Sequence, residues 1–551
     1  MLQNIYALPR RIQENINFST LRSRLSVSDK HILPSWAPVF ILVVLAYIAR
    51  AKAFDASSLF HDDAWEAVSI NHAHWSEILK FSFSHPGFIS LNRVASNLLG
   101  LQNGSESVVT VLVSIASLIA VYYITLYVFE KTLWAIVCTA LVHFNPVHII
   151  YSGRIKAYIY EVLIVFVVCF FIEWFRRRPR PTAATYVFFL AMIPIGFFSL
   201  YALIIAVTAV AYILFTAPKE QRLRILPGVG LLATLTILLF AALTKAYNSV
   251  DLAKLWAARG AFFDLSSLDF FDFIERVEKS FFLIPDWSHP YSWPSVDFHG
   301  LIFVSMIAAC ALILKYSAQH FDKFVVLLWG TLLLLAFVGK IPMGGEDRGM
   351  IRLNLIFLPC HALILIAGTR IFLEKLSRIG AKARFNFAWV RTSLLVIASL
   401  YSLFLVYSSI ALRIHYPGPY KGVRDAVRFV ENNFDPKALV VPLPGAVYQY
   451  SGFTSKRVVL AHFNNVIGYA PTFPDDNVLV PRFAGTADAA RRVYAAKFSK
   501  FDTVILFEQH SWVLPKVREA LDEILLQDGH ALASRYVFDS VQVTVWKRRS
   551  Q

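Results

Sequence analysis

Residues 107–129 read SVVTVLVSIASLIAVYYITLYVF and contain no charged side chain. A hydrocarbon core about 30 Å thick takes roughly 20 helical residues to cross, so this run predicts a membrane-spanning helix. The whole chain agrees, because 57% of its 551 residues are hydrophobic and only 16% are charged. Ordinary soluble domains carry about 25% charged residues. The composition therefore excludes an ordinary cytosolic enzyme and a disordered chain.

Long apolar runs bounded by charges, Pro or Gly recur on both sides of this segment and predict about eleven spans in all. Two of them, inside 183–217, are the least regular, because Pro194, Gly196 and Ser199 interrupt the apolar run. The predicted spans are 36–53, 107–129, 132–150, 157–175, 183–198, 200–217, 224–245, 298–316, 322–341, 350–370 and 391–412.

The basic residues lie in short clusters between the apolar runs, as in Arg176–Arg180, and predict the orientation of the chain. Lys and Arg accumulate in short cytoplasmic loops. The segment 1–35 is therefore expected in the cytoplasm, with the connections 55–106 and 247–297 outside. The net charge of +16 follows from these clusters and does not indicate nucleic-acid binding.

From Tyr416 on, the composition becomes that of a soluble domain, with short β-rich runs alternating with helical ones. An odd number of spans places this segment, 416–551, outside the membrane as an α/β domain. The fold class predicted for the chain is thus a polytopic α-helical membrane protein with a C-terminal soluble α/β domain. All four cysteines lie inside apolar runs, without the spacing of a metal or disulfide framework.

The first outside loop contains FHDDAWEAV at residues 60–68, with Asp62 and Asp63 adjacent. Two carboxylates close to the end of a span could act as a general base on a hydroxyl or amine at the membrane surface. The alternative is a helix cap, since Asp63 followed by Glu66 fits a capping box before a helix that would run to about Leu79. Both interpretations stay open from the spacing.

A short outside turn, YSGRIKAY at residues 151–158, carries Arg154 and Lys156 where few cations are expected. A guanidinium and an ammonium at the outer headgroup level could hold a lipid phosphate. The alternative is snorkelling of two span-flanking residues to the headgroups.

A Gly-rich outside turn, PMGGEDRGMIR at residues 342–352, contains Arg348 and Arg352. A cation just inside the lipid boundary is costly unless it is paired, so Arg352 is expected to face the bundle interior. Its partner there could be a phosphate, Glu346 or Asp347.

The outside connection 247–297 is rich in aromatic residues, which indicates helices lying in the membrane interface. Trp287 and Trp293 could stack on a sugar. The alternative is that these rings belong to the aromatic belt at the interface.

The order and sidedness of these features resemble the GT-C superfamily of polyprenyl-phosphate-dependent glycosyltransferases, over roughly residues 36–412. The resemblance includes a His-Pro element at His85 that departs from the family at Gly87, and a late Arg352 followed by Leu353 in place of Tyr. It is strongest to the bacterial branch with galacturonic acid, aminoarabinose and protein O-mannosyl transferases.

The resemblance implies a role for each matching residue. Asp62 would be the base and Asp63 its partner, orienting the acceptor or a divalent metal such as Mg²⁺ or Mn²⁺. Ligands of the donor phosphate would be Arg154, Lys156, Arg348 and Arg352. Residues on the acceptor side would be Glu66, His85, Trp287 and Trp293.

The implied activity is transfer of a sugar from a polyprenyl-phosphate donor to a glycolipid, polysaccharide or protein acceptor, by inverting displacement at the outer face of a bacterial inner membrane. The C-terminal domain would then be periplasmic. A transporter or flippase of lipid-linked sugars, or a non-catalytic cell-envelope scaffold, are the alternatives. Charged residues near span centres and broken helices in matching halves would favour the transporter, and these signals are sparse.

Overall fold

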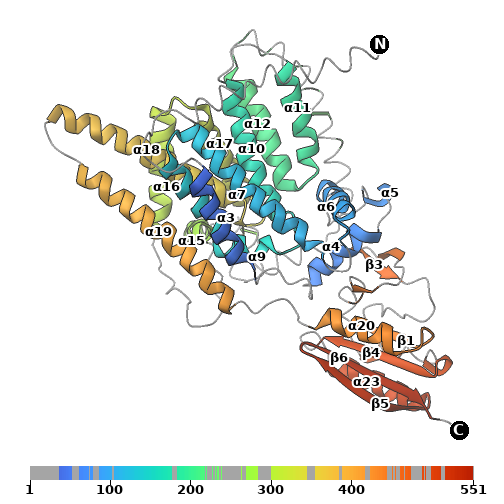
Figure 1. The fold of residues 1–551 in the computed structure, drawn as a ribbon. Coiled ribbons are helices and arrows are strands. Elements are labelled where there is room, and N and C mark those ends of the chain that lie inside the picture. The colour runs from blue at the N-terminus through green and yellow to red at the C-terminus, as the bar shows by residue number, and fades with distance from the viewer. Residues whose placement is uncertain are drawn as a thin grey trace.

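A computed structural model of the chain shows a large helical bundle joined to a small α/β domain (Figure 1). The structure describes residues 36–51, 61–72, 75–78, 86–101, 105–176, 183–217, 262–263, 269–282, 300–343, 354–383, 388–415, 422–443, 450, 453–454, 459–463, 466–472, 487–488, 491, 498–509 and 515–549, with isolated positions between 219 and 238.

Most of the described helices of the bundle follow predicted apolar runs, and four lie in the predicted connections 55–106 and 247–297. They are α3 (Trp36–Arg50), α4 (His61–His72), α5 (Trp75–Ile78), α6 (Pro86–Leu99), α7 (Ser107–Phe129), α8 (Thr132–His143), α9 (Pro146–Ser152), α10 (Tyr158–Arg176), α11 (Ala183–Gly196), α12 (Leu200–Thr216), α15 (Phe270–Phe282), α16 (Leu301–Tyr316), α17 (His320–Phe337), α18 (Phe357–Ala383) and α19 (Ala388–His415).

Four of these helices contain stretches long and apolar enough to cross a membrane: Ser107–Phe129, Tyr158–Phe175, His320–Phe337 and Phe357–Ile379. The pair α8 and α9, bent by 66° at a short break, counts as a fifth if it forms one span. The protein is therefore an integral membrane protein. The count of eleven spans stays a prediction, because α3, α12, α16 and a part of α19 are shorter apolar helices and the predicted span 224–245 lies mostly outside the described residues.

The irregular stretch 183–217 forms two helices, as predicted. Ser199 separates them and caps α12, where its hydroxyl accepts a hydrogen bond from the backbone N–H of Ala202 at 2.9 Å. Pro194 lies inside α11. The break therefore has a local cause in the sequence.

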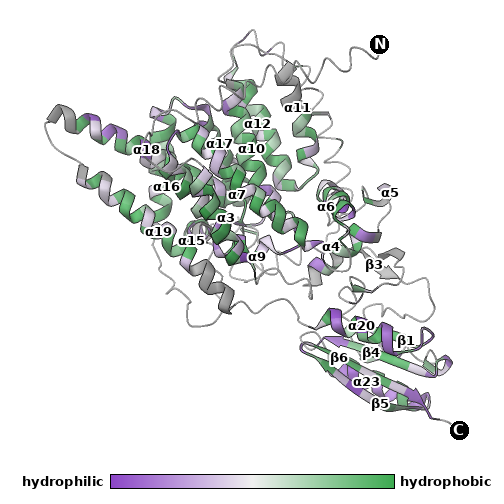
Figure 2. Cartoon of the chain, viewed as in Figure 1, coloured by the Kyte–Doolittle hydropathy of each residue, from purple (hydrophilic) through white to green (hydrophobic). Residues whose placement is uncertain are grey.

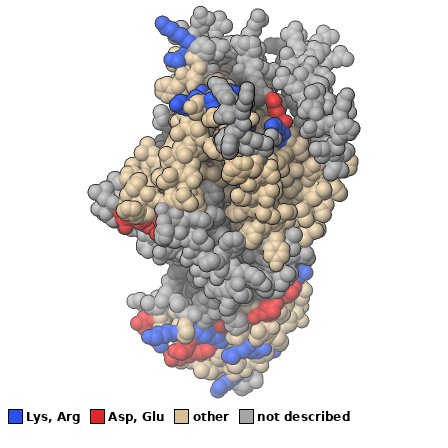
Figure 3. All heavy atoms as spheres, turned by 90° about the vertical axis from the view of Figure 1, so that its left-hand side faces the viewer, with Lys and Arg blue, Asp and Glu red and all other residues tan. Residues whose placement is uncertain are grey.

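The bundle is mainly apolar, whereas polar and apolar residues alternate along the α/β domain (Figure 2). The charged side chains drawn in Figure 3 gather over the α/β domain and near the opposite end of the molecule. The surface between them is mainly uncharged, apart from a small acidic group. Inside the bundle, α16 and α18 approach closely, since a Cβ added to Gly368 would lie 2.6 Å from the Cβ of Ala309. Small residues allow such close packing between membrane helices.

The α/β domain contains a four-stranded sheet in the order β1-β4-β6-β5, with β1 and β4 parallel and the other neighbours antiparallel. Four predicted strands are confirmed, whereas β3 and β5 were not predicted. The predicted helices at 421–433 and 514–527 are confirmed too, and the predicted helix at 486–498 lies mostly outside the described residues. The elements are β1 (Leu439–Pro442), β2 (Val459–Phe463), β3 (Val466–Thr472), β4 (Thr503–Gln509), β5 (His530–Phe538), β6 (Val541–Arg548), α20 (Val423–Asn433) and α23 (Pro515–Gln527), with β2 and β3 in a second sheet.

The α/β domain shares a hydrophobic cluster with one end of the bundle. Ala64 of α4, Phe88 of α6 and Ile155 before α10 belong to the same cluster as Val427 of α20 and Phe507 of β4. Burial of apolar area at about 25 cal/mol per Å² favours such contact. The cluster places the α/β domain next to the segments that carry the predicted acidic and cationic residues.

Candidate functional site

Helix α4 carries the acidic residues of the connection 55–106, which was predicted to lie outside. Asp63 lies inside this helix, which begins at His61 and ends at His72, so the predicted capping box ahead of a helix to Leu79 is wrong. Asp63 and Glu66 are three residues apart and therefore share one face of the helix. Only 2% of Asp63 and 7% of Glu66 are exposed. Asp62 belongs to the same helical turn, and its side chain lies outside the described residues.

The turn between α9 and α10 carries the two cations. The backbone N–H of Arg154 donates to the carbonyl of Tyr151 at 3.2 Å, and that of Lys156 donates to the carbonyl of Arg154 at 2.9 Å. Between them, Ile155 is completely buried in the cluster shared with the α/β domain. The Arg154 guanidinium also lies over the Tyr151 ring, 5.3 Å from its centroid. This tight turn therefore anchors an apolar side chain between two basic ones.

Two ion pairs join the acidic helix to the cationic turn. The Nε–H of Arg154 donates to Oδ2 of Asp63, and Nζ of Lys156 lies 3.3 Å from Oε1 of Glu66. The structure thus brings together two motifs that lie about ninety residues apart in the chain. The side chains of Arg154 and Lys156 are 9% and 15% exposed, so snorkelling into the headgroups does not describe them.

Asp63, Glu66, Arg154 and Lys156 together form the four-residue site. Its charges balance, since it contains two carboxylates and two cations. Charges interact more strongly here than at an open surface, because neighbouring side chains replace water. Nearby, the side-chain amide of Asn71 on α4 donates to the fully buried Glu106, which precedes α7, at 2.6 Å. Sequence reasoning did not single out Glu106. Its position directly before an uncharged span was the available signal.

The other predicted site residues cannot be compared with the structure. His85, Trp287, Trp293, Arg348 and Arg352 all lie outside the described residues. For the predicted metal, no group of three or more His, Cys, Asp or Glu side chains suited to an ion occurs within the described ranges. Asp63 has a guanidinium beside it, so its described surroundings do not fit a metal ligand.

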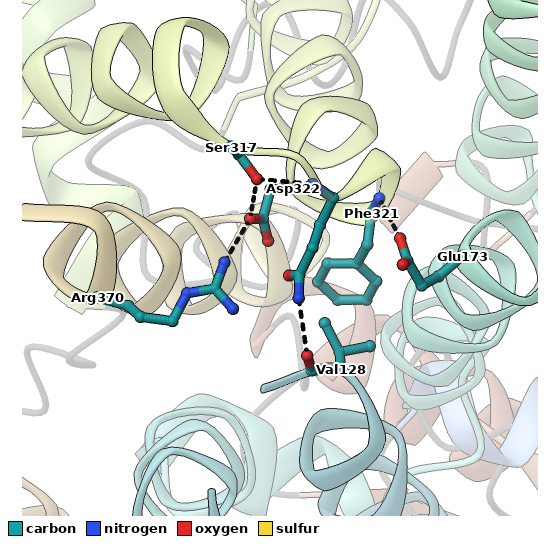
Figure 4. Close-up of polar contacts among 7 residues, drawn as sticks. Val128, Glu173, Ser317, Phe321, Asp322 and Arg370 are labelled. Carbon is teal, nitrogen blue, oxygen red and sulfur yellow. Dashed lines mark hydrogen bonds and ion pairs between the residues drawn. The ribbon is translucent and has the colours of Figure 1, made fainter. Parts of the chain in front are cut away.

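A second buried polar network lies at the other end of α10 (Figure 4). Oδ2 of Asp322, in the first turn of α17, accepts from the hydroxyl of Ser317 at 2.6 Å and from the guanidinium of Arg370 at 2.8 Å. Oε2 of Glu173, on α10, accepts from the backbone N–H of Phe321 at 3.0 Å. The amide of Gln319 donates to the carbonyl of Val128 at 3.1 Å. This network ties the ends of α7, α10 and α17 to α18, and sequence reasoning missed it.

Comparison with known proteins rests on structure, since no protein-family profile and no curated protein matches the chain. ArnT from Cupriavidus metallidurans bound to undecaprenyl phosphate is similar, with a TM-score of 0.52 at 12% identity over 93% of this chain and 98% of that one. Apo ArnT gives a TM-score of 0.54 at 12% identity, covering 92% and 97%. The protein has the GT-C fold. The GT-C oligosaccharyltransferase of Archaeoglobus fulgidus, solved with Zn and sulfate, is more distant, with a TM-score of 0.48 at 14% identity over 91% and 72%.

In this GT-C fold the four-residue site combines the two kinds of group that displacement of a phosphate leaving group needs. A carboxylate can accept a proton from a nucleophile. Arg and Lys can stabilise charge that develops on departing phosphate oxygens. Asp63, Glu66, Arg154 and Lys156 supply both kinds within one buried cluster.

Proposed function

We propose that this protein is a membrane glycosyltransferase that moves a sugar from a polyprenyl-phosphate donor to a glycolipid, polysaccharide or protein acceptor. The observation that carries the proposal is the pairing of the acidic helix with the cationic turn, Asp63 with Arg154 and Glu66 with Lys156. The GT-C fold adds support, because the similar ArnT structure was solved with undecaprenyl phosphate bound.

Arg154 and Lys156 bind the phosphate of the donor. A guanidinium has five N–H donors in a fixed fork and binds phosphate oxygens in a bidentate manner, whereas an ammonium acts as a point charge. As the bond between the anomeric carbon and the phosphate oxygen breaks, its electron pair stays on the phosphate. Arg154 and Lys156 stabilise that charge, so the leaving group needs no general acid.

The carboxylates of α4 orient and deprotonate the acceptor. The acceptor oxygen or nitrogen attacks the anomeric carbon from the face opposite the phosphate, and its proton passes to a carboxylate of α4. In this assignment Asp62 is the base and Asp63 orients the acceptor beside it. The new glycosidic bond forms as the old one breaks, which inverts the anomeric configuration.

The ion pairs couple these two events. With no donor present, Arg154 and Lys156 are held by carboxylates, which keeps the cations in place at little cost in uncompensated charge. An arriving phosphate competes for the same donors and weakens their hold on Asp63 and Glu66. The released Asp63 can then orient the acceptor beside Asp62, the base, when the donor is in place.

The finer parts of the proposal follow the resemblance to the GT-C superfamily. Arg348 and Arg352 complete the phosphate site, and His85 with Trp287 and Trp293 contacts the acceptor. The reaction takes place at the outer face of a bacterial inner membrane, with the C-terminal domain in the periplasm. Clusters of Lys and Arg in the alternate loops support this orientation.

The test uses cells that lack the protein, complemented with variants of the full chain. Mass spectrometry of surface glycolipid and polysaccharide should show a sugar that is lost in the deletion and restored by the wild type. Asp62→Asn and Asp63→Asn should lower its amount at least about 100-fold, the usual scale for losing a general base or its partner. Asp272→Asn is the control, since Asp272 pairs with Arg276 on α15.

Purified protein then separates the candidate functions. Transfer from a defined polyprenyl-phosphate sugar, lost in Asp63→Asn, supports the enzyme. Movement of the lipid-linked sugar across vesicles without transfer would support a flippase instead. Full complementation by both Asn variants would remove this site from the reaction. Chelator followed by Mg²⁺ or Mn²⁺ in the same assay tests the metal requirement.

A further inference from the structure

Arg50, the last residue of α3, has an almost completely buried side chain that contacts its own helix and three others. Its Nε donates to the hydroxyl of Ser114 on α7 at 3.0 Å. One terminal nitrogen donates to the carbonyl of Ala46 on α3 at 3.2 Å. The other donates to the carbonyl of His143 at 3.0 Å and lies 3.3 Å from Nδ1 of His148. In the described part of the chain these partners are neutral, and no ion pair to Arg50 occurs.

The last two contacts fall on either side of the break between α8 and α9. His143 ends α8, where the final carbonyls lack partners within the helix. His148 lies in the first turn of α9, and its ring packs on that of His143 with centroids 4.6 Å apart. Arg50 therefore contacts both helices at the break, where α8 and α9 are bent by 66°. We call this break the elbow, and α8 and α9 its two arms.

Helix α9 connects this elbow to the four-residue site. It is seven residues long and fully buried, and it ends at Ser152, two residues before Arg154. Its rise of 1.5 Å per residue places the cationic turn about 10 Å from the break. A change in the angle at the elbow therefore moves Arg154 and Lys156 directly, with no flexible loop between to absorb it.

We propose that Arg50 is a positioning residue, which sets the angle between α8 and α9 and thereby holds Arg154 and Lys156 where they meet the donor phosphate. The inference rests on the proposed function for its consequence and on the contacts of Arg50 for its geometry. A planar guanidinium fork reaches all four partners at once, whereas an ammonium or an amide reaches fewer of them. Burying a cation among neutral partners is costly, and this joint between helices accounts for its presence.

The geometry is tested with spin labels at Lys131→Cys and Gly153→Cys, which bracket the two arms of the elbow. The four native cysteines are buried, so the engineered ones take the labels. The distance distribution between the labels is measured by pulsed electron resonance in the wild-type background and in Arg50→Lys, Arg50→Gln and Arg50→Met. Affinity for undecaprenyl phosphate is measured on the unlabelled proteins. Arg276→Gln is the matched control, since it removes a guanidinium from α15.

We expect Arg50→Gln and Arg50→Met to shift or broaden the distance distribution and to weaken undecaprenyl phosphate binding at least tenfold. In a transfer assay the same variants should raise KM for the donor more than they lower kcat. Arg50→Lys should fall between them and the wild type. The control should match the wild type in both measurements.

An unchanged distance distribution in folded Arg50→Gln would overturn the inference. So would a changed distribution with unchanged affinity for undecaprenyl phosphate. If Arg50→Gln and Arg50→Met do not fold, the same two measurements are compared between Arg50→Lys and the wild type. Failure of the wild type to bind undecaprenyl phosphate would instead count against the proposed function, and the label distances would still decide whether Arg50 sets the elbow.

Discussion

Helix α10 has a buried charged network at each end, and the two networks differ in the groups that their carboxylates bind. At its N-terminal end, which is the outer end in the proposed orientation, Asp63 and Glu66 contact side-chain cations from the turn before α10. At the inner end, Glu173 and Asp322 act at the start of α17, where Glu173 accepts a backbone N–H and Asp322 holds Ser317 and Arg370. Helix α10 has 19 residues, so its two ends are about 28 Å apart.

This difference shows why burial of an ion pair says little by itself about function. A carboxylate on a helix N-terminus stabilises the fold by satisfying donors that the helix leaves without partners. Those donors cannot move to a ligand without unwinding the helix. Side-chain cations can exchange a carboxylate for a phosphate by rotating. The outer network has two such cations on two carboxylates and can therefore bind substrate. The inner network combines the guanidinium of Arg370 with a hydroxyl and a backbone N–H, and it holds the bundle together.

The largest expected effect comes from reversing the outer pair. Asp63→Arg and Arg154→Asp should each lower the rate of sugar transfer by about 1,000-fold or more, through lost orientation of the acceptor and lost phosphate stabilisation. The double variant restores the ion pair in reverse and should recover thermal stability without recovering the rate. Initial rates and unfolding midpoints of all three proteins check this. Recovery of the rate in the double variant would make the outer pair a structural one.

The inner network should show the opposite pattern. Arg370→Met leaves the buried Asp322 without its cation and should cost about 3–5 kcal/mol of stability. Asp322→Ala with Arg370→Met should cost less than Arg370→Met alone, because no buried charge is then left uncompensated. Unfolding in detergent measures both, and the rate per folded molecule should stay at the wild-type value. A specific loss of transfer in a stable inner variant would contradict the division of roles.

A smaller effect is expected at the second outer pair. Lys156→Gln removes the charge of Nζ and should raise KM for the donor about tenfold, equivalent to about 1.4 kcal/mol of binding. Lys156→Arg keeps the charge and should remain within a few-fold of the wild type. Steady-state kinetics at varied donor concentration separate KM from kcat. Equal KM values in Lys156→Gln and the wild type would show that Arg154 binds the phosphate without help from Lys156.

The smallest effect concerns the elbow that leads to the outer site. Oδ1 of Asn145 accepts from the backbone N–H of Val147 at 3.0 Å and of His148 at 3.4 Å, which caps α9. Asn145→Ala should cost about 1 kcal/mol, the usual value for losing an N-cap, whereas Asn145→Asp should cost less. Thermal unfolding of the two variants measures the difference. Equal losses would show that the cap contributes nothing at this break.

The helices of the bundle were largely predictable, because an apolar run of spanning length is a local property of the chain. The predicted span 107–129 coincides with α7, and the interruption at Ser199 was predicted as well. In the α/β domain, β3 and β5 were missed. β5 is an edge strand with mostly exposed side chains, so its residues lack the apolar pattern on which strand prediction depends.

The sequence singled out the residues of the candidate site, but it did not predict which of them form ion pairs with one another. Asp63, Arg154 and Lys156 were singled out by residue type and by a local violation of the charge rule. The pairing of Asp63 with Arg154 was not foreseen, and a helix cap was an open alternative. Arg50 was passed over, because a cation at the end of an apolar run has the same local pattern as an ordinary span-flanking residue.

Hydropathy and charge clusters alone determined that the chain is a membrane protein, with an approximate set of helices and a soluble tail, because transfer of a helix into lipid depends on its own residues. Only the tertiary structure decided which charges meet. Contacts between residues ninety positions apart depend on how helices pack and where they break, and no periodicity along the chain records them.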